Sequence, residues 1–211
     1  MTIQLYCFGE SGNSYKAALT LELAGLDWAP VFVDFFNGEA RGPAFRALNP
    51  MGEAPVMVDG DITLSQSGVI QYYVAEKTGR FDGATEAERR DVMRWMFWDN
   101  HKMSSQAGAL RFMMNFLPEE KRPAEAINWL TGRVRAALTT LDHALEGRDW
   151  LVGGAPTLAD LACCGYLYYP EPFGFDRAAL PNIDRWLDGI AALPGWKHPY
   201  DLMPGSPTDR A

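Results

Sequence analysis

Clustered positive charge and long apolar runs are both missing from this sequence. Its 19 lysines and arginines are scattered among 27 acidic residues, and the formal net charge is −8. Because nucleic acids and anionic membranes attract basic patches, neither is expected as a partner. No apolar stretch approaches the roughly 20 residues that span a bilayer. The chain starts directly in a strand-like segment rather than a signal peptide, so we expect a soluble, cytoplasmic protein.

Cysteine is scarce as well, with three residues in the whole chain. Cys163 and Cys164 are adjacent in a helical segment, a poor arrangement for an ordinary structural disulfide, and no Cys-x-x-Cys pair is present. Dithiol redox chemistry and a zinc site made of thiolates are therefore not expected, and we predict no metal. Cys7 lies inside an apolar strand-like run, where a buried small hydrophobic residue is a better interpretation than a nucleophile.

The first 79 positions carry apolar and turn-forming residues in the order β-α-β-α-β-β-α. We expect strands at 3–8 and 30–34, a hairpin over 56–64, and helices at 15–24, 43–48 and 65–77. A strand, a helix and a second strand in succession form a right-handed crossover with parallel strands. This order of elements predicts a thioredoxin-like domain of the α/β class.

Polar groups that suit ligand binding flank the predicted hairpin. Asp59 and Gly60 are expected to form its two-residue turn. Pro55 opens the first strand, and an Ala-Pro bond in such a tight turn is a candidate for the cis form. Ser65 is expected to cap the helix that follows, whose free N–H groups and dipole attract a carboxylate.

The rest of the chain changes character, because no strand-like segment follows Thr85. Apolar residues at helical spacing predict helices over 86–116 and 123–145, one from Thr157 to about Tyr168, and a last one capped by Asn182. The predicted organisation is a thioredoxin-like domain over 1–79, a linker over 80–85, an all-helical bundle over 86–196 and an irregular tail over 197–211.

Five short motifs in this order resemble those of a known family. They are the loop Ser11-Gly-Asn-Ser-Tyr-Lys after the first strand, Phe45 followed by Leu48-Asn49-Pro50, Ala54-Pro55, Gln66-Ser67, and the segment from Pro156 to Asp160. Each motif is weak alone, but together they resemble the bacterial cytosolic glutathione transferases over residues 3–196. The loop is similar to that of the serine-type members rather than the tyrosine-type members.

The resemblance implies a glutathione site with named residues. Ser11 matches the serine whose hydroxyl donates to the glutathione thiolate, with Ser14 and Asn13 as alternative donors. Pro55 matches the family's cis-proline, beside which the backbone of Ala54 pairs with the cysteinyl part of glutathione as an added strand would. Glutathione is then a co-substrate.

The same resemblance also implies roles for residues of the last two motifs. Gln66 and Ser67 match the pair that holds the γ-glutamyl carboxylate and amine. Thr157 and Asp160 match a capping box that serves folding rather than chemistry.

One position departs from the family pattern. Many relatives carry Lys, His or Gln before the cis-proline motif to hold the glycine carboxylate of glutathione, whereas this chain has Gly52 and Glu53 there. An acid beside a carboxylate is unfavourable by roughly 1 kcal/mol at short range in water-like surroundings. Either glutathione binds weakly, or a cation such as Lys102 or Arg111 compensates.

Candidates for an electrophile pocket are less specific. Phe8 follows the first strand, and four others lie in the predicted long helix: Trp98, His101, Met103 and Arg111. The alternative interpretation is a packed core for the aromatic and Met side chains and a helix surface for His101.

Three functions remain open at this point. The first is a transferase that conjugates glutathione to a hydrophobic electrophile. The second is a glutathione-dependent isomerase, dehalogenase or lyase that uses the same activated thiol, and the third is a non-catalytic binding or interaction protein of this fold. The resemblance also implies a homodimer.

Overall fold

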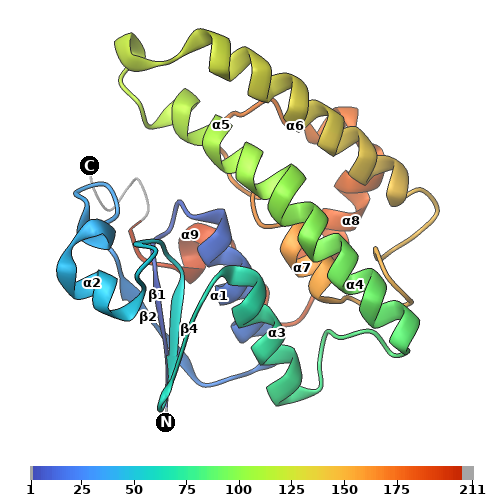
Figure 1. The fold of residues 1–211 in the computed structure, drawn as a ribbon. Helices are drawn as coiled ribbons and strands as arrows, with labels where there is room; N and C mark the ends of the chain where they lie inside the picture. The colour runs from blue at the N-terminus through green and yellow to red at the C-terminus, as the bar shows by residue number, and fades with distance from the viewer. Residues whose placement is uncertain (1, 206–211) are drawn as a thin grey trace. The chain divides into compact units, whose positions relative to one another are not determined.

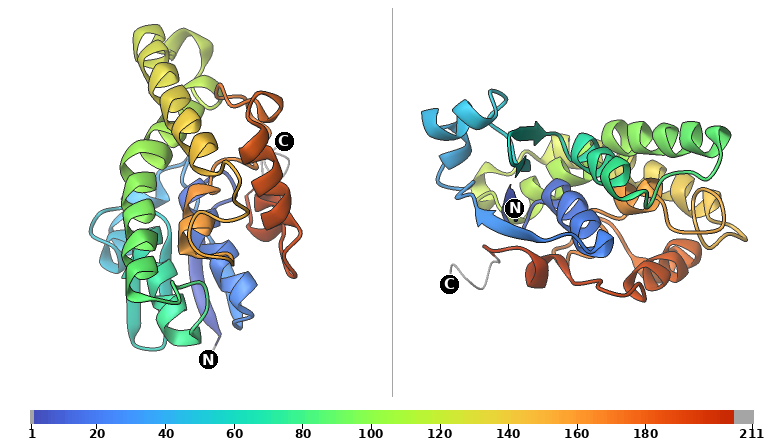
Figure 2. Two further views of the ribbon diagram at one scale, coloured as in Figure 1. Left: turned by 90° about the vertical axis from the view of Figure 1, so that its right-hand side faces the viewer. Right: turned by 90° about the horizontal axis from the view of Figure 1, so that it is seen from below.

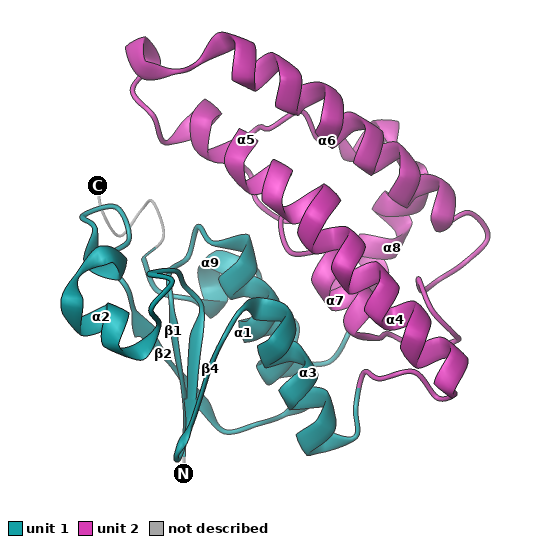
Figure 3. Ribbon diagram, in the orientation of Figure 1, with its two compact units in different colours: residues 1–80, 193–211 teal, residues 81–192 magenta. Residues whose placement is uncertain are grey.

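The computed structural model describes residues 2–205, which fall into two compact units (Figure 3). Unit 1 contains the described residues up to Arg80 together with those from Leu193 onward, and unit 2 contains Phe81–Ala192. The chain therefore begins unit 1, builds unit 2, and returns to unit 1.

Unit 1 is built on a four-stranded mixed sheet with the strand order β2-β1-β3-β4. Its strands are β1 (Ile3–Cys7), β2 (Trp28–Phe32), β3 (Val56–Asp59) and β4 (Ile62–Ser65). The β1–β2 pair is parallel, as the crossover predicts, and the other two pairs are antiparallel. With the helices between the strands, this arrangement confirms the predicted thioredoxin-like fold.

Helices cover both faces of this sheet. Helices α1 (Gly12–Ala24) and α3 (Ser67–Thr78) lie on one face, while α2 (Pro43–Leu48), preceded by the 3₁₀ turn η1 (Glu39–Arg41), lies on the other (Figures 1 and 2). Strand β1 serves both faces because its side chains alternate. Leu5 and Cys7 are fully buried, and Tyr6 packs edge to face on Phe45 of α2.

The hairpin and the start of α3 are each shifted slightly from their predicted places. Asp59 pairs with Ile62, so the turn consists of Gly60 and Asp61 rather than Asp59 and Gly60. The predicted cap Ser65 still pairs with Val56 in the sheet, and Gln66 takes the N-cap position of α3 instead. Strand β4 thus continues one residue further than predicted, and α3 begins one residue later.

Unit 2 is helical throughout, and none of its residues forms a strand. Its elements are α4 (Glu86–Trp98), the π-helical turn η2 (Asp99–Ser104), α5 (Ser105–Asn115), the 3₁₀ turn η3 (Glu119–Lys121), α6 (Ala124–Ala144), α7 (Leu158–Cys163), the 3₁₀ turn η4 (Arg177–Ala179) and α8 (Pro181–Ala191). The predicted helix over 86–116 is therefore interrupted by η2. Helix α6 runs back alongside α5 (Figure 1), and α7 packs against α4.

Two helix ends in unit 2 differ from the prediction. Helix α7 ends at Cys163 rather than near Tyr168. Helix α8 starts at Pro181, one residue before the predicted cap Asn182. The backbone N–H and the side-chain amide of Asn182 both donate to the carboxylate of Asp142 on α6. The start of α8 is thus satisfied by a tertiary contact that the local sequence does not reveal.

The C-terminal part also corrects the predicted division of the chain. Residues from Leu193 belong to unit 1 and not to the helical bundle. The predicted irregular tail contains a short helix, α9 (Pro199–Leu202), which packs on α1; residues 206–211 lie outside the described part. The N–H of Gly9 donates to the carbonyl of Pro204 at 2.7 Å. The Tyr15 hydroxyl donates to the carbonyl of Lys197 at 2.9 Å.

Between residues 2 and 205, none of the helices has both the length and the apolar character that crossing a membrane requires. The same residues contain no group of three or more His, Cys, Asp or Glu side chains placed to hold a metal ion.

Candidate active site

The sheet register brings the polar motifs of unit 1 to one edge. Tyr6 pairs with Val56, and Val56 pairs with Ser65. The end of β1, the start of β3 and the end of β4 therefore lie side by side. The loop that contains Ser11 leaves the first of these points. Ala54-Pro55 and Gln66-Ser67 lie at the other two, although they are separate in the sequence.

Ser11 is the N-cap of α1 and is almost fully buried. Its backbone is extended, and its Oγ accepts a hydrogen bond from the N–H of Ser14 at 3.1 Å. The carbonyl of Ser11 accepts from the N–H of Tyr15. A serine hydroxyl has one proton to donate besides its two acceptor positions. Capping therefore uses the oxygen of Ser11 and leaves its proton for another acceptor.

The two alternative donors occupy the first turn of the same helix. Ser14 is fully buried, and its Oγ has no hydrogen-bond partner among residues 2–205; the same holds for Oδ1 of Asn13. A buried hydroxyl without a partner costs about 1–3 kcal/mol. Ser14 therefore remains an alternative to Ser11 as donor to a ligand.

Ala54 and Pro55 stand opposite the end of β4. The peptide bond between them is cis, the form for which the sequence makes it a candidate. Pro55 is buried, while Ala54 packs against an apolar cluster under the sheet made of Val33, Ala40, Phe45 and Val56. This packing fixes the backbone of the predicted peptide-binding position.

Gln66 and Ser67 form the junction between β4 and α3. Gln66 has φ 69° and ψ 116°, in the region that a residue with a Cβ seldom adopts. Such strain costs on the order of 1–3 kcal/mol and concentrates at functional sites. Ser67 is the first residue of α3 and is buried. The junction thus presents a helix N-terminus, with its unpaired N–H groups, at the same edge as Ser11.

Glu53 lies in this site as well. Its carbonyl accepts from the side-chain amide of Asn49 at 2.7 Å, and its exposed carboxylate lies 3.4 Å from the amide nitrogen of Gln66. The acid that departs from the family pattern therefore faces one of the predicted ligand-binding side chains. The amide of Gln66 offsets part of its charge.

Sequence analysis does not identify Arg46 as a basic residue beside the turn that contains Gly52. Arg46 is on α2, and a Cβ added to Gly52 would lie 3.5 Å from its Nε. The approach depends on how the chain turns back after α2, which spacing alone does not reveal.

The predicted electrophile-pocket residues are divided between the two units. Phe8 belongs to unit 1, where it is buried and stacks on Phe35 with ring centroids 4.6 Å apart. In unit 2, Trp98 ends α4 with its ring 5.1 Å from Trp95. Met103 is buried in η2, whereas His101 is exposed on the same turn. Their assignment to a pocket stays a prediction.

Arg111 is engaged inside unit 2. Its side chain is buried, and its Nη2 and Nε lie 2.5 Å and 3.1 Å from a carboxylate oxygen of Glu171. The guanidinium carbon lies 3.9 Å from the ring centre of Tyr169. A charge held this way serves unit 2 itself, so Arg111 does not suit the compensating role that the sequence suggested for it.

Cys7 is excluded as the nucleophile by its surroundings. The residue is fully buried in β1, and burial raises the pKa of its thiol to about 12. Because the thiolate is the reactive form, Cys7 is inert near neutral pH. The interpretation of Cys7 as a buried small hydrophobic residue is confirmed.

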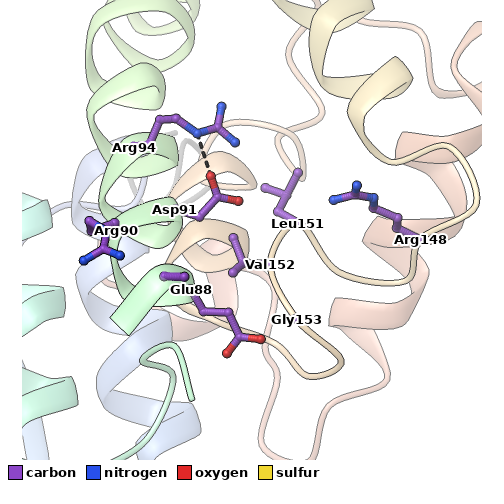
Figure 4. A pocket seen from close by; sticks show the side chains of 9 residues that line it. Glu88, Arg90, Asp91, Arg94, Arg148, Leu151, Val152 and Gly153 are labelled. Atoms are coloured by element: carbon purple, nitrogen blue, oxygen red, sulfur yellow. Dashed lines mark hydrogen bonds and ion pairs between the residues drawn. The ribbon is translucent and has the colours of Figure 1, made fainter. Parts of the chain in front are cut away.

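Unit 2 also contains an open groove of about 440 Å³ between α4 and the loop before α7 (Figure 4). Its charged side chains are mostly engaged with neighbours. Arg94 pairs with Asp91 at 2.6 Å, and the carboxylate of Glu88 accepts from the N–H groups of Ala84 and Thr85. We therefore assign no ligand to this groove.

A thioredoxin-like unit with a cis-proline beside a serine-capped helix, joined to an all-helical unit, defines a two-part class of protein. Comparison with known families identifies that class. Residues 1–76 match the family model of the glutathione S-transferase N-terminal domain, and residues 103–194 match that of the C-terminal domain. Together with the relatives described next, these matches show that the chain belongs to the glutathione S-transferase family.

Curated and solved relatives are similar over almost the whole chain. A protein of Pseudomonas aeruginosa named maleylacetoacetate isomerase is 30% identical over 97% of this chain and 99% of its own. The solved glutathione S-transferase of Xanthobacter autotrophicus is 31% identical, with a TM-score of 0.87 and 99% of each chain covered. A glutathione transferase of Burkholderia graminis, solved with two glutathione molecules per subunit, is 26% identical with a TM-score of 0.83, covering 92% of this chain and 85% of that one.

Proposed function

We propose that this protein is a glutathione transferase that binds glutathione at the sheet edge of unit 1 and ionises its thiol. One observation carries the proposal. Ser11 caps α1 through its oxygen, which leaves a hydroxyl proton to donate at the helix N-terminus beside the cis Ala54-Pro55 bond. Membership of the family and the Burkholderia graminis structure with bound glutathione support glutathione as the co-substrate.

The hydrogen bond from Ser11 and the dipole of α1 together suffice to ionise the bound thiol near neutral pH. A free thiol with a pKa near 8.5 is only about 3% ionised at pH 7, and the thiolate is the nucleophile. A hydrogen bond to a charged group contributes about 1.5–3 kcal/mol, which lowers the thiol pKa by about 1–2 units. The N-terminal dipole of α1 acts in the same direction. One hydroxyl and one helix end therefore leave the bound thiol mostly ionised.

The other motifs hold the peptide. Gln66 and Ser67 bind the γ-glutamyl end at the N-terminus of α3, and the backbone of Ala54 pairs with the cysteinyl residue. The thiol proton leaves to solvent. The thiolate sulfur then forms a bond to the electrophilic carbon of the second substrate, whose leaving group departs with the electron pair of the broken bond.

A glutathione-dependent isomerase is the second candidate. It is favoured by the similarity to the Pseudomonas aeruginosa protein named maleylacetoacetate isomerase. In that case the same thiolate adds to the substrate and leaves again after rotation about the weakened bond, so glutathione is not consumed. Loss of free thiol with substrate turnover indicates the transferase, and turnover at constant thiol indicates the isomerase.

We also propose that the protein works as a cytoplasmic homodimer. The chain has only three cysteines and no Cys-x-x-Cys pair, which fits a reducing compartment. Large apolar side chains are exposed on α3 of unit 1, at Val69 and Tyr72, and on α4 of unit 2, at Met93 and Phe97. Apolar side chains that face solvent in this way are suited to self-association.

The test is a pH titration of the ultraviolet thiolate band of protein-bound glutathione. For wild type we expect ionisation well below the pH at which free glutathione ionises. Ser11→Ala should raise the pKa of the bound thiol by about 1–2 units, and Ser11→Thr should restore it because the hydroxyl is kept.

Two controls make the result specific. Ser11→Gly removes the hydroxyl but costs only a few tenths of a kcal/mol as an N-cap, so it separates the thiol effect from misfolding. Ser14→Ala should leave the thiol pKa unchanged. A shift in Ser14→Ala instead of Ser11→Ala would move the role to Ser14, and the absence of bound thiolate at saturating glutathione would contradict the proposal.

A further inference from the structure

The side chain of Met51 touches a residue of the proposed glutathione site. Met51 lies on the turn after α2 and is 58% exposed. Its Sδ accepts a hydrogen bond from the side-chain amide nitrogen Nε2 of Gln66 at 3.2 Å. Gln66 is one of the two residues proposed to hold the γ-glutamyl end of glutathione. A thioether that is open to solvent is therefore in direct contact with a side chain that the ligand needs.

The backbone holds both partners of this contact in place. The N–H of Met51 donates to Oδ1 of Asn49 at 3.1 Å, and Asn49 is itself buried. Gln66 is the N-cap of α3, where its carbonyl accepts from the N–H groups of Val69 and Ile70. Neither backbone can withdraw from the contact without breaking these hydrogen bonds. A chemical change at the sulfur therefore acts on the amide of Gln66.

The amide of Gln66 has two acceptors of unequal strength. One is the thioether sulfur, which is a weak acceptor, and the other is the carboxylate of Glu53, 3.4 Å from the same Nε2. The bond to sulfur is therefore easily given up when a ligand binds. Oxidation converts the thioether into a polar sulfoxide. An oxygen on the lone pair that faces Gln66 does not fit into the 3.2 Å between Sδ and Nε2, so the amide is displaced and held by a stronger acceptor.

Exposure makes Met51 one of two methionines that are open to an oxidant. Between residues 2 and 205, Met51 and Met93 are the exposed methionines, at 58% and 47%, and the others are buried or half-buried. All three cysteines are buried as well. Met93 lies on α4 in unit 2, outside the unit that contains the proposed site. It therefore provides a matched control for oxidation at an exposed methionine.

We propose that Met51 is an oxidation site through which peroxides weaken the binding of glutathione. The inference rests on the proposed function. The sulfur attacks one oxygen of hydrogen peroxide, so that a sulfur–oxygen bond forms and the oxygen–oxygen bond breaks. The second oxygen leaves with the electron pair of that bond and takes the proton of the first, which gives water. The sulfur loses two electrons to the peroxide, and a methionine sulfoxide reductase reverses the change.

The experiment measures glutathione binding by titration calorimetry before and after oxidation. Hydrogen peroxide is applied to the free protein and destroyed with catalase before glutathione is added. Peptide mapping by mass spectrometry measures the fraction of sulfoxide at each methionine. The proteins are wild type, Met51→Leu and Met93→Leu. Leucine is close to methionine in volume but has no sulfur to oxidise.

Oxidised wild type should bind glutathione about tenfold more weakly than the reduced protein, as expected for the loss of one hydrogen bond, and methionine sulfoxide reductase should restore binding. Met93→Leu should behave like wild type, whereas Met51→Leu should bind equally well before and after peroxide. Three results would overturn the assignment of Met51 while the proposed function stands: no sulfoxide at Met51, unchanged affinity when Met51 is fully oxidised, or an equal loss in Met51→Leu. Absence of glutathione binding by reduced wild type overturns both.

Discussion

Cys7 and Ser11 lie close together in the sequence, yet their surroundings give their side chains opposite roles. Cys7 ends a strand whose inward side chains are buried, and burial raises the pKa of its thiol to about 12. Ser11 follows the loop and caps a helix, so its hydroxyl meets N–H groups and a favourable dipole. The sheet thus keeps the protein's own thiol neutral beside a site proposed to ionise the thiol of a ligand.

Alkylation tests the state of Cys7. In the native protein, iodoacetamide should not modify Cys7 between pH 7 and 9, because a thiol with a pKa near 12 is only about 0.1% ionised at pH 9. Peptide mapping by mass spectrometry measures the extent. In urea the same residue should react with a midpoint near pH 8.5, and native reaction with that midpoint would contradict the burial of the thiol.

The difference between the folded-state and unfolded-state pKa of the Cys7 thiol also makes the stability of the protein depend on pH. The thiol is neutral when folded and ionises more easily when unfolded, so its burial stabilises the fold fully below about pH 8.5. That contribution is lost progressively as the pH rises toward the folded-state pKa of about 12.

Residue-level predictions from sequence succeed where local chemistry decides and fail where the chain must first fold. Ser11, Pro55 and Ser67 meet at one edge because each lies just beyond the end of a predicted strand, and the order of those strands is readable from sequence although the hairpin turn lies one residue later than predicted. Arg46 and Arg111 were not predictable in this way. The position of Arg46 depends on the path of the turn after α2. The environment of Arg111 depends on Glu171, which is distant in the sequence.

At the scale of elements, two helices of unit 2 begin with capping boxes that differ in burial. Thr85 and Glu88 form an exposed box at α4. Thr157 and Asp160 form a buried one at α7, as the sequence predicted. The carboxylate of Asp160 also accepts from the N–H of Leu151 and from the indole of Trp186, each at 2.9 Å. Burial raises the pKa of Asp160, while these hydrogen bonds oppose that shift.

Replacing the acid in each box should separate a local cap from a network. Asp160→Ala leaves buried donors of Leu151, Thr157 and Trp186 without an acceptor, and each costs about 1–3 kcal/mol. We expect a loss of about 4 kcal/mol in the free energy of unfolding, against about 1 kcal/mol for Glu88→Ala. Urea titration measures both. Equal losses would show that Asp160 acts only as a cap, and Asp160→Asn, which keeps one acceptor oxygen, should fall between the two.

The elements were predictable in type and order, and their ends were less so. Helical spacing correctly predicted α6, but a regular apolar pattern does not reveal that Asp99–Ser104 widens into a π-helical turn. The start of α8 shifts from Asn182 to Leu180, where the carboxylate of Asp142 satisfies N–H groups that a local cap would otherwise serve. At α3 the cap shifts from Ser65 to Gln66 because β4 continues through Ser65.

At the scale of the whole molecule, the return of the chain to unit 1 links the site to the C-terminal part. Gly9 precedes the Ser11 loop, and its N–H is bound by the carbonyl of Pro204. A Cβ at Gly9 would lie 3.2 Å from the ring of Tyr200 and 3.3 Å from the backbone of Gly205. The returning segment thus braces the loop at close contact.

Gly9→Ala should therefore displace this segment. We expect a loss of about 1–3 kcal/mol in stability, the range for overpacking, with faster hydrogen exchange in residues 199–205 and at the start of α1. The matched control is Gly132→Ala on α6, where an added Cβ meets nothing within 4 Å. It should be neutral or stabilising by up to about 1 kcal/mol. Unchanged exchange in 199–205 would show that the contact at Gly9 does not brace the loop.

The same path of the chain sets an order of events during synthesis. When residue 80 leaves the ribosome, the four strands are already made, but Gly9 and Tyr15 still lack the carbonyls of Pro204 and Lys197. The whole of unit 2 is translated before those partners emerge. A nascent chain therefore carries the Ser11 loop unbraced until Lys197 and Pro204 have emerged.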